Sequence, residues 1–437
     1  MPAGEHHYMN IKLRLGVLNF FEYYVWGAWL LTIGTWWFQT LNWSGTSFGA
    51  IFSTMGIASL FMPSLAGIVA DKWINSERLL GLFHLVGAAL LLAIPHATDP
   101  DRMFWVVLLY MCCYMPTISL SIAVSYNALK RQGLDVVCTY PPIRVWGTVG
   151  FIAGTWTTSL LGFKASAMQF DVAAAASALL GLYAFTLPKC PPQMVAGDSR
   201  SLTERLGLTS FVLFRNRNMA VFFIFAMLLG GALQLTNAYG DAFISDFVKV
   251  PAFAHLPTVK YSTLIVSISQ VSETLFILTI PFFLKRFGIK AVMTMSMLAW
   301  VLRFGLFAFG NPDPMGRLWM IVLSCIVYGM AFDFFNISGS LFVEGQADPK
   351  IRASAQGLFM LMTNGVGAVL GSLLAGWMID RFFTNHTCND AVLVCKDWHG
   401  IWLTFAIYAL VMAVLFVPLF KHRHDAATAA RAAQGHL

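Results

Sequence analysis

Long apolar runs recur along the whole chain and are separated by short polar segments. A run of about 20 residues is long enough, at 1.5 Å per residue in a helix, to cross a hydrocarbon core of about 30 Å. The pattern therefore predicts an all-α integral membrane protein with about 12 transmembrane helices. We expect these helices at residues 13–39, 45–70, 79–97, 103–128, 143–163, 168–187, 217–246, 261–284, 290–310, 317–343, 352–380 and 400–420.

Composition agrees with this pattern. Of the 437 residues, 58% are hydrophobic and 11% are charged, and the mean hydropathy is +0.68. Soluble domains need more polar surface than this. The first span is too long for a cleavable secretory signal and contains Glu22, so we expect it to remain as a helix in the membrane.

The longest polar interruption divides the predicted spans into six and six. It covers residues 188–216 and opens with Pro188, Pro191 and Pro192. The segment "PPIRVWGTVGF" at the start of the fifth span has a short echo, "PKIRASAQGLF", six spans later. Two six-helix halves around a central cavity are a common transporter plan. We expect an N-terminal half at 1–187, a cytoplasmic central loop at 188–216, a C-terminal half at 217–420 and a cytoplasmic tail at 421–437.

Positive charges predict the orientation in the membrane, because Lys and Arg in short loops favour the cytoplasmic side. With the N-terminus inside, about 20 of the 28 Lys and Arg residues fall in inner segments and about seven in outer segments. Both termini are therefore expected in the cytoplasm. The net charge of +7 is explained by this topology and by contact with anionic lipids, and no basic soluble module indicates nucleic-acid binding.

Cysteines and short motifs indicate no enzymatic chemistry. Cys388 and Cys395 share the predicted outer loop before the last span, where a disulfide can form in an oxidising compartment, but the sequence leaves this bridge open. The chain lacks a CxxC pair, an HExxH helix and a Walker loop, so we expect no catalytic site, metal or cofactor. A membrane enzyme or sensor would need a catalytic set or an appended domain, which we do not find.

Four charged residues lie well inside apolar spans, away from the span ends: Glu22, Glu273, Arg303 and Asp333. A charged side chain at a helix centre costs about 2.5 to 3.5 kcal/mol on insertion scales, so such residues usually serve an ion path, a substrate contact or a partner charge. Asp333 stands among phenylalanines in "YGMAFDFFNISGS". Arg303 can simply neutralise one of the acids.

Amide side chains accompany these charges at helical spacing. Gln234 and Asn237 are three residues apart in the seventh span, and Gln270 and Glu273 repeat this spacing in the eighth, so each pair shares a helix face. A single Gln would favour hydrogen bonding between helices. Two pairs together with an acid favour a polar lining that binds hydroxyls and ring nitrogens.

Two further faces complete the predicted lining. Arg144, Thr148 and Phe151 share a face of the fifth span, although an arginine one turn into a helix is as often a snorkelling anchor. Tyr328 and Phe332 lie beside Asp333 in the tenth span. Such aromatics are ordinary in a bilayer, yet beside a polar cavity they can stack on a planar ligand.

A buried acid can move protons, because burial raises the pKa of a carboxyl group, whereas water or an opposing charge lowers it. A protein that alternates between a wet and a dry state can thereby couple proton entry to substrate movement. Asp333 and Glu273 are the preferred candidates for this role, and Glu22 is a third.

The chain resembles the nucleoside:proton symporters of the major facilitator superfamily. The likeness is carried by "GIVADKW" at 67–73, "PPIRVWGTVGF" at 141–151, "LQLTNAYG" at 233–240, "SISQVSETLFILTIPFF" at 267–283 and "YGMAFDFFNISGS" at 328–340, and it runs from residue 10 to the last span. It implies twelve helices in two six-helix domains, location in the inner membrane of Gram-negative bacteria, and proton-driven uptake of purine and pyrimidine nucleosides. We expect a monomer.

The resemblance also implies roles for individual residues. Asp333 and Glu273 match the acids that the family needs for proton coupling, whereas at Glu22 close members carry glutamine and more distant members carry an acid. A proton-coupled sugar symporter of the same fold remains the alternative, since ribose is itself a sugar. The implied nucleoside site consists of Arg144, Thr148, Phe151, Gln234, Asn237, Gln270, Glu273, Tyr328 and Phe332.

Overall fold

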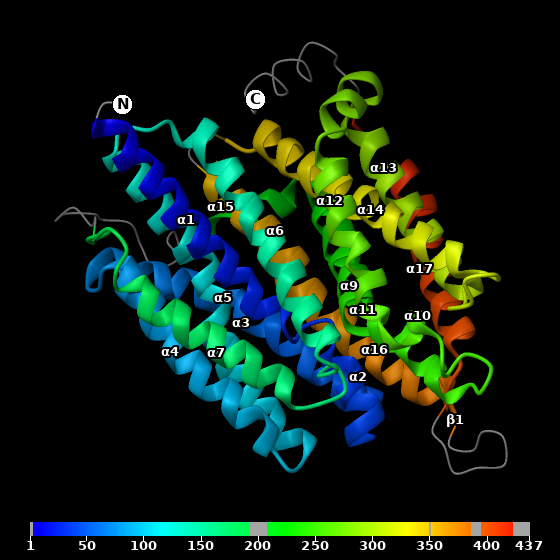
Figure 1. The fold of residues 1–437 in the computed structure, drawn as a ribbon. Helices are drawn as coiled ribbons and strands as arrows, with labels where there is room; N and C mark the ends of the chain where they lie inside the picture. The colour runs from blue at the N-terminus through cyan, green and yellow to red at the C-terminus, as the bar shows by residue number, and fades with distance from the viewer. Residues whose placement is uncertain (1–2, 193–207, 349–350, 386–394, 423–437) are drawn as a thin grey trace. The chain divides into compact units, whose positions relative to one another are not determined.

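A computed structural model describes residues 3–192, 208–348, 351–385 and 395–422 (Figure 1). These residues are almost entirely helical, because a chain inside lipid must satisfy its backbone hydrogen bonds within each segment. The helices before the central interruption are α1 (Ala3–Gly27), α2 (Ile33–Thr35), η1 (Trp36–Leu41), α3 (Gly45–Lys72), α4 (Ser76–Ala93), η2 (Ile94–His96), α5 (Pro100–Arg131), α6 (Val136–Leu160) and α7 (Met168–Ala184).

The described part after the interruption is also helical, apart from a short antiparallel strand pair, β1 (Thr384–Asn385) with β2 (Cys395–Lys396). Its helices are η3 (Leu208–Arg215), α9 (Arg217–Asp246), η4 (Phe247–Lys249), α10 (Pro257–Lys260), α11 (Ser262–Val266), α12 (Ile268–Ile277), α13 (Ile280–Phe309), α14 (Leu318–Gln346), α15 (Arg352–Met360), η5 (Leu361–Gly367), α16 (Ala368–Phe383) and α17 (Trp398–Leu419).

The fold is that of an all-α membrane protein, as predicted. Within the described ranges, eight helical segments are long and apolar enough to cross a membrane, and Met168–Ala184 and Ser262–Ile277 are shorter apolar helices. Each of the twelve predicted spans contains helix. The number twelve itself stays a prediction.

Two predicted spans are broken rather than continuous. The span predicted at 13–39 consists of α1, a turn, α2 and the π-helix η1. The span predicted at 261–284 is divided among α11, α12 and the start of α13. The break before the following span lies at Gly288, whose φ of 79° interrupts the helical backbone. Only glycine adopts such a φ without steric cost, so this turn depends on residue 288.

The chain forms two compact units. The first contains Met1–Ile33 and Ile57–Leu206, and the second contains Gly34–Gly56 and Gly207–Leu437. The predicted boundary at residues 188–216 stays a prediction. The sequence did not indicate that Gly34–Gly56 belongs to the second unit. One cause is Asp380 at the end of α16, whose carboxylate accepts hydrogen bonds from the backbone N–H groups of Gly45 and Thr46 at 2.7 and 2.6 Å and so caps α3.

In the first unit, α1 and α6 run side by side with their backbones in contact (Figure 1). A β-carbon at Gly27 would overlap the backbone of Phe151, and one at Gly150 would overlap the carbonyl group of Phe20. Small residues allow this close approach of membrane helices. The glycines therefore determine which side chains of α6 face α1.

Candidate functional site

In the second unit, predicted site residues come from α9, α12 and α14. Gln234 and Gln270 are buried, whereas Asn237 and Glu273 are half-buried. On α14, Tyr328 and Asp333 are buried and Phe332 is half-buried. The rings of Tyr328 and Phe332 are stacked, with centroids 5.9 Å apart and an interplanar angle of 6°. The two parallel rings therefore form a flat aromatic stack.

Close packing of α12 against α14 brings the two predicted coupling acids together. A β-carbon at Gly329 would lie within 2.6 Å of the Ser272 carbonyl oxygen and 2.8 Å of the Glu273 backbone nitrogen. Asp333 lies one helical turn from Gly329 on the same face, is 5% exposed, and is within electrostatic reach of Glu273. Like charges so close disfavour simultaneous ionisation, so this pair is suited to binding a proton.

Arg303 on α13 is fully buried behind these residues. Its guanidinium group donates to the Ser324 carbonyl oxygen at 2.6 Å, to Thr236 Oγ1 at 3.4 Å and to Ser269 Oγ at 3.5 Å. It also lies 4.6 Å from the centre of the Tyr328 ring. Arg303 thus joins α9, α12 and α14 through neutral acceptors and an aromatic face, which are contacts that the sequence could not reveal.

Several buried polar atoms near these residues have no protein partner in the part of the chain that the structure describes. They are Gln234 Oε1, Gln270 Oε1, Asp333 Oδ2 and Arg303 Nη2. Buried polar groups in proteins are almost always hydrogen-bonded. Gln270 Oε1 and Asp333 Oδ2 are therefore free to bind a polar ligand, whereas Gln234 lies beside Gly49, Phe52 and Ser372.

In the first unit, the predicted face of α6 lies against α1. Arg144 places its guanidinium carbon 4.0 Å from the centre of the Tyr23 ring, and the ring of Phe151 packs edge-on against Trp26 at 6.3 Å. Arg144, Thr148 and Phe151 are all half-buried. The structure brings these three residues together, and it adds two aromatic neighbours, Tyr23 and Trp26, that sequence reasoning missed.

Glu22 is fully buried in a polar network of the first unit. Its Oε2 lies 2.9 Å from Nε2 of His84 on α4, and its Oε1 accepts from Thr117 on α5 at 2.6 Å. His84 Nδ1 lies 3.1 Å from Ser177 Oγ on α7. Sequence reasoning missed His84, although a histidine in the middle of an apolar span is itself an unusual signal.

Asp241 on α9 is another buried acid that sequence reasoning missed. Its carboxylate accepts hydrogen bonds from Thr35 and Ser262 at 2.6 Å and from Thr263 at 2.9 Å. These hydrogen bonds occupy both carboxylate oxygens of Asp241. Asp241 therefore explains how α2 and α11 are held to α9 rather than how a substrate is bound.

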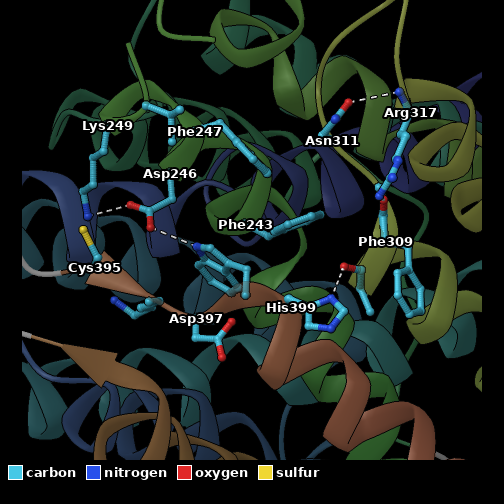
Figure 2. Close-up of a pocket in the computed structure, with 15 residues that line it drawn as sticks. Phe243, Asp246, Phe247, Lys249, Phe309, Asn311, Arg317, Cys395, Asp397 and His399 are labelled. Carbon is cyan, nitrogen blue, oxygen red and sulfur yellow. Dashed lines mark hydrogen bonds and ion pairs between the residues drawn. The ribbon is translucent and has the colours of Figure 1, made fainter. Parts of the chain in front are cut away.

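A pocket of about 580 Å³ in the second unit is lined by residues of α9, α13 and α17 and of the segments next to them (Figure 2). Lys249 pairs with Asp246 at 2.6 Å, and Trp398 donates to the same carboxylate at 2.9 Å. Burial lowers the pKa of Lys396 to about 8. None of the nine predicted nucleoside-site residues lines this pocket, so its size does not identify it as the predicted site.

Six of the seven cysteines lie in the described residues, and five of these are free thiols. Cys112, Cys113 and Cys325 are free thiols, as are Cys138 and Cys190. Cys395, which lines the pocket, is disulfide-bonded. Its predicted partner, Cys388, lies outside the described residues.

Comparisons with known proteins cover nearly the whole chain. Residues 9–425 match the family model described as "Nucleoside H+ symporter". The xanthosine permease of Escherichia coli is 52% identical over 417 residues, which is 95% of this chain and 97% of that protein. The nucleoside permease NupG of E. coli is 49% identical over 416 residues, again 95% and 97%.

Solved structures show the same likeness. The crystal structure of the nucleoside transporter NupG superposes with a TM-score of 0.86 at 49% identity, covering 95% of this chain and all of that one. A POT family transporter at 13% identity superposes with a TM-score of 0.65. At that identity the second likeness concerns the fold alone.

Proposed function

We propose that this chain, which belongs to the nucleoside H⁺ symporter family of the major facilitator superfamily, imports purine and pyrimidine nucleosides together with protons by alternating access. The chain is a transporter with many membrane-spanning helices, and its relatives at 52% and 49% identity are permeases for xanthosine and for nucleosides. The observation that best supports the proposal is that Gln270 Oε1 and Asp333 Oδ2, which belong to the helices carrying the two coupling acids, are buried and have no protein partner among the described residues.

In this proposal, the nine predicted residues bind the nucleoside. The stacked rings of Tyr328 and Phe332 offer a flat apolar face to the base, as does Phe151 in the first unit. Gln234, Asn237 and Gln270 carry both donors and acceptors, which suits base edges and ribose hydroxyls. Arg144, Thr148 and Glu273 supply the remaining polar contacts.

Asp333 and Glu273 carry the proton. In a dry state the pair keeps a proton, because burying two like charges side by side is costly. Water that reaches the pair in an open state reduces this cost and allows the proton to leave. The proton thereby changes the charge of a residue, Glu273, that also binds the substrate, and this shared residue couples the two movements.

We further propose that the protein lies in the bacterial inner membrane as a monomer with both termini in the cytoplasm. The placement of Lys and Arg supports this orientation. Single cysteines introduced by Lys260→Cys and Lys421→Cys, in a background without other reactive thiols, test it. An impermeant thiol reagent added to intact cells should label position 260 and spare position 421, and the reverse pattern would contradict the proposed topology.

Uptake into vesicles tests the transport proposal directly. Purified protein in liposomes should accumulate radiolabelled uridine and a labelled purine nucleoside when the outside is made acidic, and liposomes without protein should not. Unlabelled nucleosides should compete for uptake and free ribose should not. Transport of ribose without transport of uridine would overturn the proposal in favour of the sugar symporter.

A further inference from the structure

Four helices of the first unit meet around Glu22 and His84. Glu22 comes from α1, His84 from α4, Thr117 and Tyr114 from α5, and Ser177 from α7. All five side chains are at most 2% exposed. This cluster lies in the first unit, whereas Asp333 and Glu273 lie in the second, so it is a separate ionisable group that the proposed function does not yet use.

The hydrogen bonds around His84 indicate how many protons the cluster holds. Ser177 Oγ donates its single proton to the His84 carbonyl oxygen at 2.9 Å. Ser177 Oγ also lies 3.1 Å from His84 Nδ1. Because the serine proton is already used, this second contact is a hydrogen bond only if Nδ1 carries a proton and donates it. Satisfying both contacts therefore assigns one ring proton to Nδ1.

The contact between His84 Nε2 and Glu22 Oε2, at 2.9 Å, then needs a second proton. With Nδ1 protonated, either Nε2 also carries a proton and the ring is an imidazolium facing a carboxylate, or Glu22 is a carboxylic acid that donates to Nε2. Both arrangements have no net charge. Removing the shared proton leaves a carboxylate facing a lone pair, with one uncompensated negative charge in a site that excludes water.

Other titratable or charged groups face this cluster from two sides. Tyr110 and Tyr114 of α5 are within electrostatic reach of Glu22, and Tyr114 donates to the Glu22 carbonyl oxygen at 2.7 Å. From α6, Arg144 and Tyr140 act on the same group of side chains. Arg144 is the positive charge among these groups.

Arg144 is within electrostatic reach of Tyr114 and Tyr140, as Glu22 is. Tyr23 follows Glu22 on α1, and its ring lies 4.0 Å below the Arg144 guanidinium carbon. A negative charge that appears on Glu22 attracts this cation and competes with any other acceptor for it. The protonation of Glu22 therefore affects a residue that the proposed function assigns to the nucleoside.

We propose that Glu22 and His84 together form a second proton-binding site, which holds one exchangeable proton and, through Arg144, links its release to nucleoside binding. When the site opens to water, the shared proton passes to a water molecule and leaves a neutral, Nδ1-protonated imidazole beside a carboxylate. The link to Arg144 rests on the proposed function. The existence of the proton site does not.

Isothermal titration calorimetry of uridine binding tests the link. Binding is measured with purified protein at several pH values and in buffers of different ionisation enthalpy, which gives the number of protons exchanged per nucleoside. The variant Glu22→Gln keeps the hydrogen bonds, because its amide can donate to His84 Nε2 and accept from Thr117, but it cannot titrate. The matched control is a second carboxyl variant, Glu77→Gln. Like Glu22, Glu77 is buried in the first unit, but it lies on α4 and accepts a hydrogen bond from the Cys190 N–H at 2.8 Å.

We expect Asp333→Asn to retain part of the proton exchange of the wild type, and the double variant with Glu22→Gln to lose that remainder. One fully linked proton changes the dissociation constant tenfold per pH unit, and this dependence should fall in Glu22→Gln but not in Glu77→Gln. Unchanged proton exchange in Glu22→Gln would overturn the link. Absence of uridine binding by the wild type would instead overturn the proposed function.

A second measurement does not depend on transport or on nucleoside binding. In protein labelled with ¹⁵N-histidine, the His84 resonances, assigned as those missing from His84→Gln, report the protonation of Nδ1 and Nε2 separately. Spectra are recorded from about pH 5 to about pH 9, and we expect Nδ1 to stay protonated while the Nε2 signal changes with pH. Nitrogen signals that are constant over this range would contradict an exchangeable proton at this site.

Discussion

Glu273 lies so close to Gly329 that a β-carbon at position 329 would come within 2.8 Å of the Glu273 backbone nitrogen. This contact between α12 and α14 occurs at the substrate-binding acid itself, one helical turn from Asp333. The pairing of the two acids therefore depends on the absence of a side chain. A glycine in an apolar span, which is unremarkable in the sequence, thus allows the close approach that the proposed proton coupling requires.

The variant Gly329→Ala should impair transport strongly while the protein still inserts and folds. The added methyl group meets backbone atoms, which cannot move aside cheaply, so the helices must separate at a cost of about 1 to 3 kcal/mol. We expect gradient-driven uridine uptake to fall about tenfold or more, with a lower melting temperature in detergent. Gly345→Ala on the same helix, where a β-carbon meets no atom within 4 Å, should behave as wild type. Equal activity of the two variants would show that the close approach is unimportant.

Arg303→Lys should weaken nucleoside binding although the charge is kept. A lysine ammonium group cannot reproduce the fork that joins Ser324, Ser269 and Thr236. Thr236 and Ser269 each precede a predicted site residue, so we expect an increase in the dissociation constant of about tenfold, or about 1.4 kcal/mol. Titration of uridine into purified protein measures it. Wild-type affinity in Arg303→Lys would mean that a simple positive charge is sufficient at this position.

Phe332→Leu should lose a stacking surface for the base. Aromatic stacking on a base is worth about 1 to 3 kcal/mol, so the dissociation constant should rise about 10-fold to 100-fold. Phe332→Tyr keeps the ring and should bind nearly as well as wild type. The lipid-facing control Phe282→Leu, at a residue that is 63% exposed, should have no effect, and a loss of affinity equal to that of Phe332→Leu would remove the argument for stacking.

Lys396 should make the stability of the protein depend on pH in a defined direction. Its pKa in the folded state is about 8 because of burial, below the value of about 10.4 of an unfolded chain. The unfolded state therefore holds this proton more tightly, and stability rises as pH increases from about 8 to about 10.4. The Phe38 ring, 3.7 Å from Nζ, offsets part of the burial cost by about 0.5 to 2 kcal/mol.

Accordingly, Lys396→Met should raise the melting temperature at pH 7, and the gain should disappear near pH 10.4, where wild-type Lys396 is largely neutral. Lys260→Met is the control, since Lys260 is exposed. Both variants should be compared with wild type at the same pH by thermal melting in detergent. A gain that is the same at pH 7 and above pH 10, or a loss at pH 7, would contradict the assigned cause.

Much of this account was accessible from the sequence. The apolar runs predict where helices lie, and the three-residue spacing of Gln270 and Glu273 predicts a shared polar face. Both inferences depend on local periodicity, which is written into consecutive residues. The stacked pair Tyr328 and Phe332, four residues apart on α14, follows from the same rule.

Contacts between helices could not be predicted in this way. The bond from Glu22 to His84 joins residues 62 positions apart, and the Arg303 guanidinium contacts three helices. Whether a buried charge pairs with another charge or with hydroxyls and carbonyls depends on which helix faces meet, and periodicity within one helix carries no information about its neighbour. The break at Gly288 falls between the spans predicted at 261–284 and 290–310, whereas the breaks within the spans predicted at 13–39 and 261–284 were missed.

The most direct test of the central claim is gradient-driven uptake by Asp333→Asn. Liposomes containing wild type, Asp333→Asn or the exposed-carboxyl control Asp101→Asn are loaded with uridine to measure exchange, or left empty to measure accumulation under an inward proton gradient. We predict that Asp333→Asn exchanges uridine but does not accumulate it, while wild type and Asp101→Asn do both. Accumulation by Asp333→Asn equal to that of wild type would contradict the assignment of the coupling proton to Asp333.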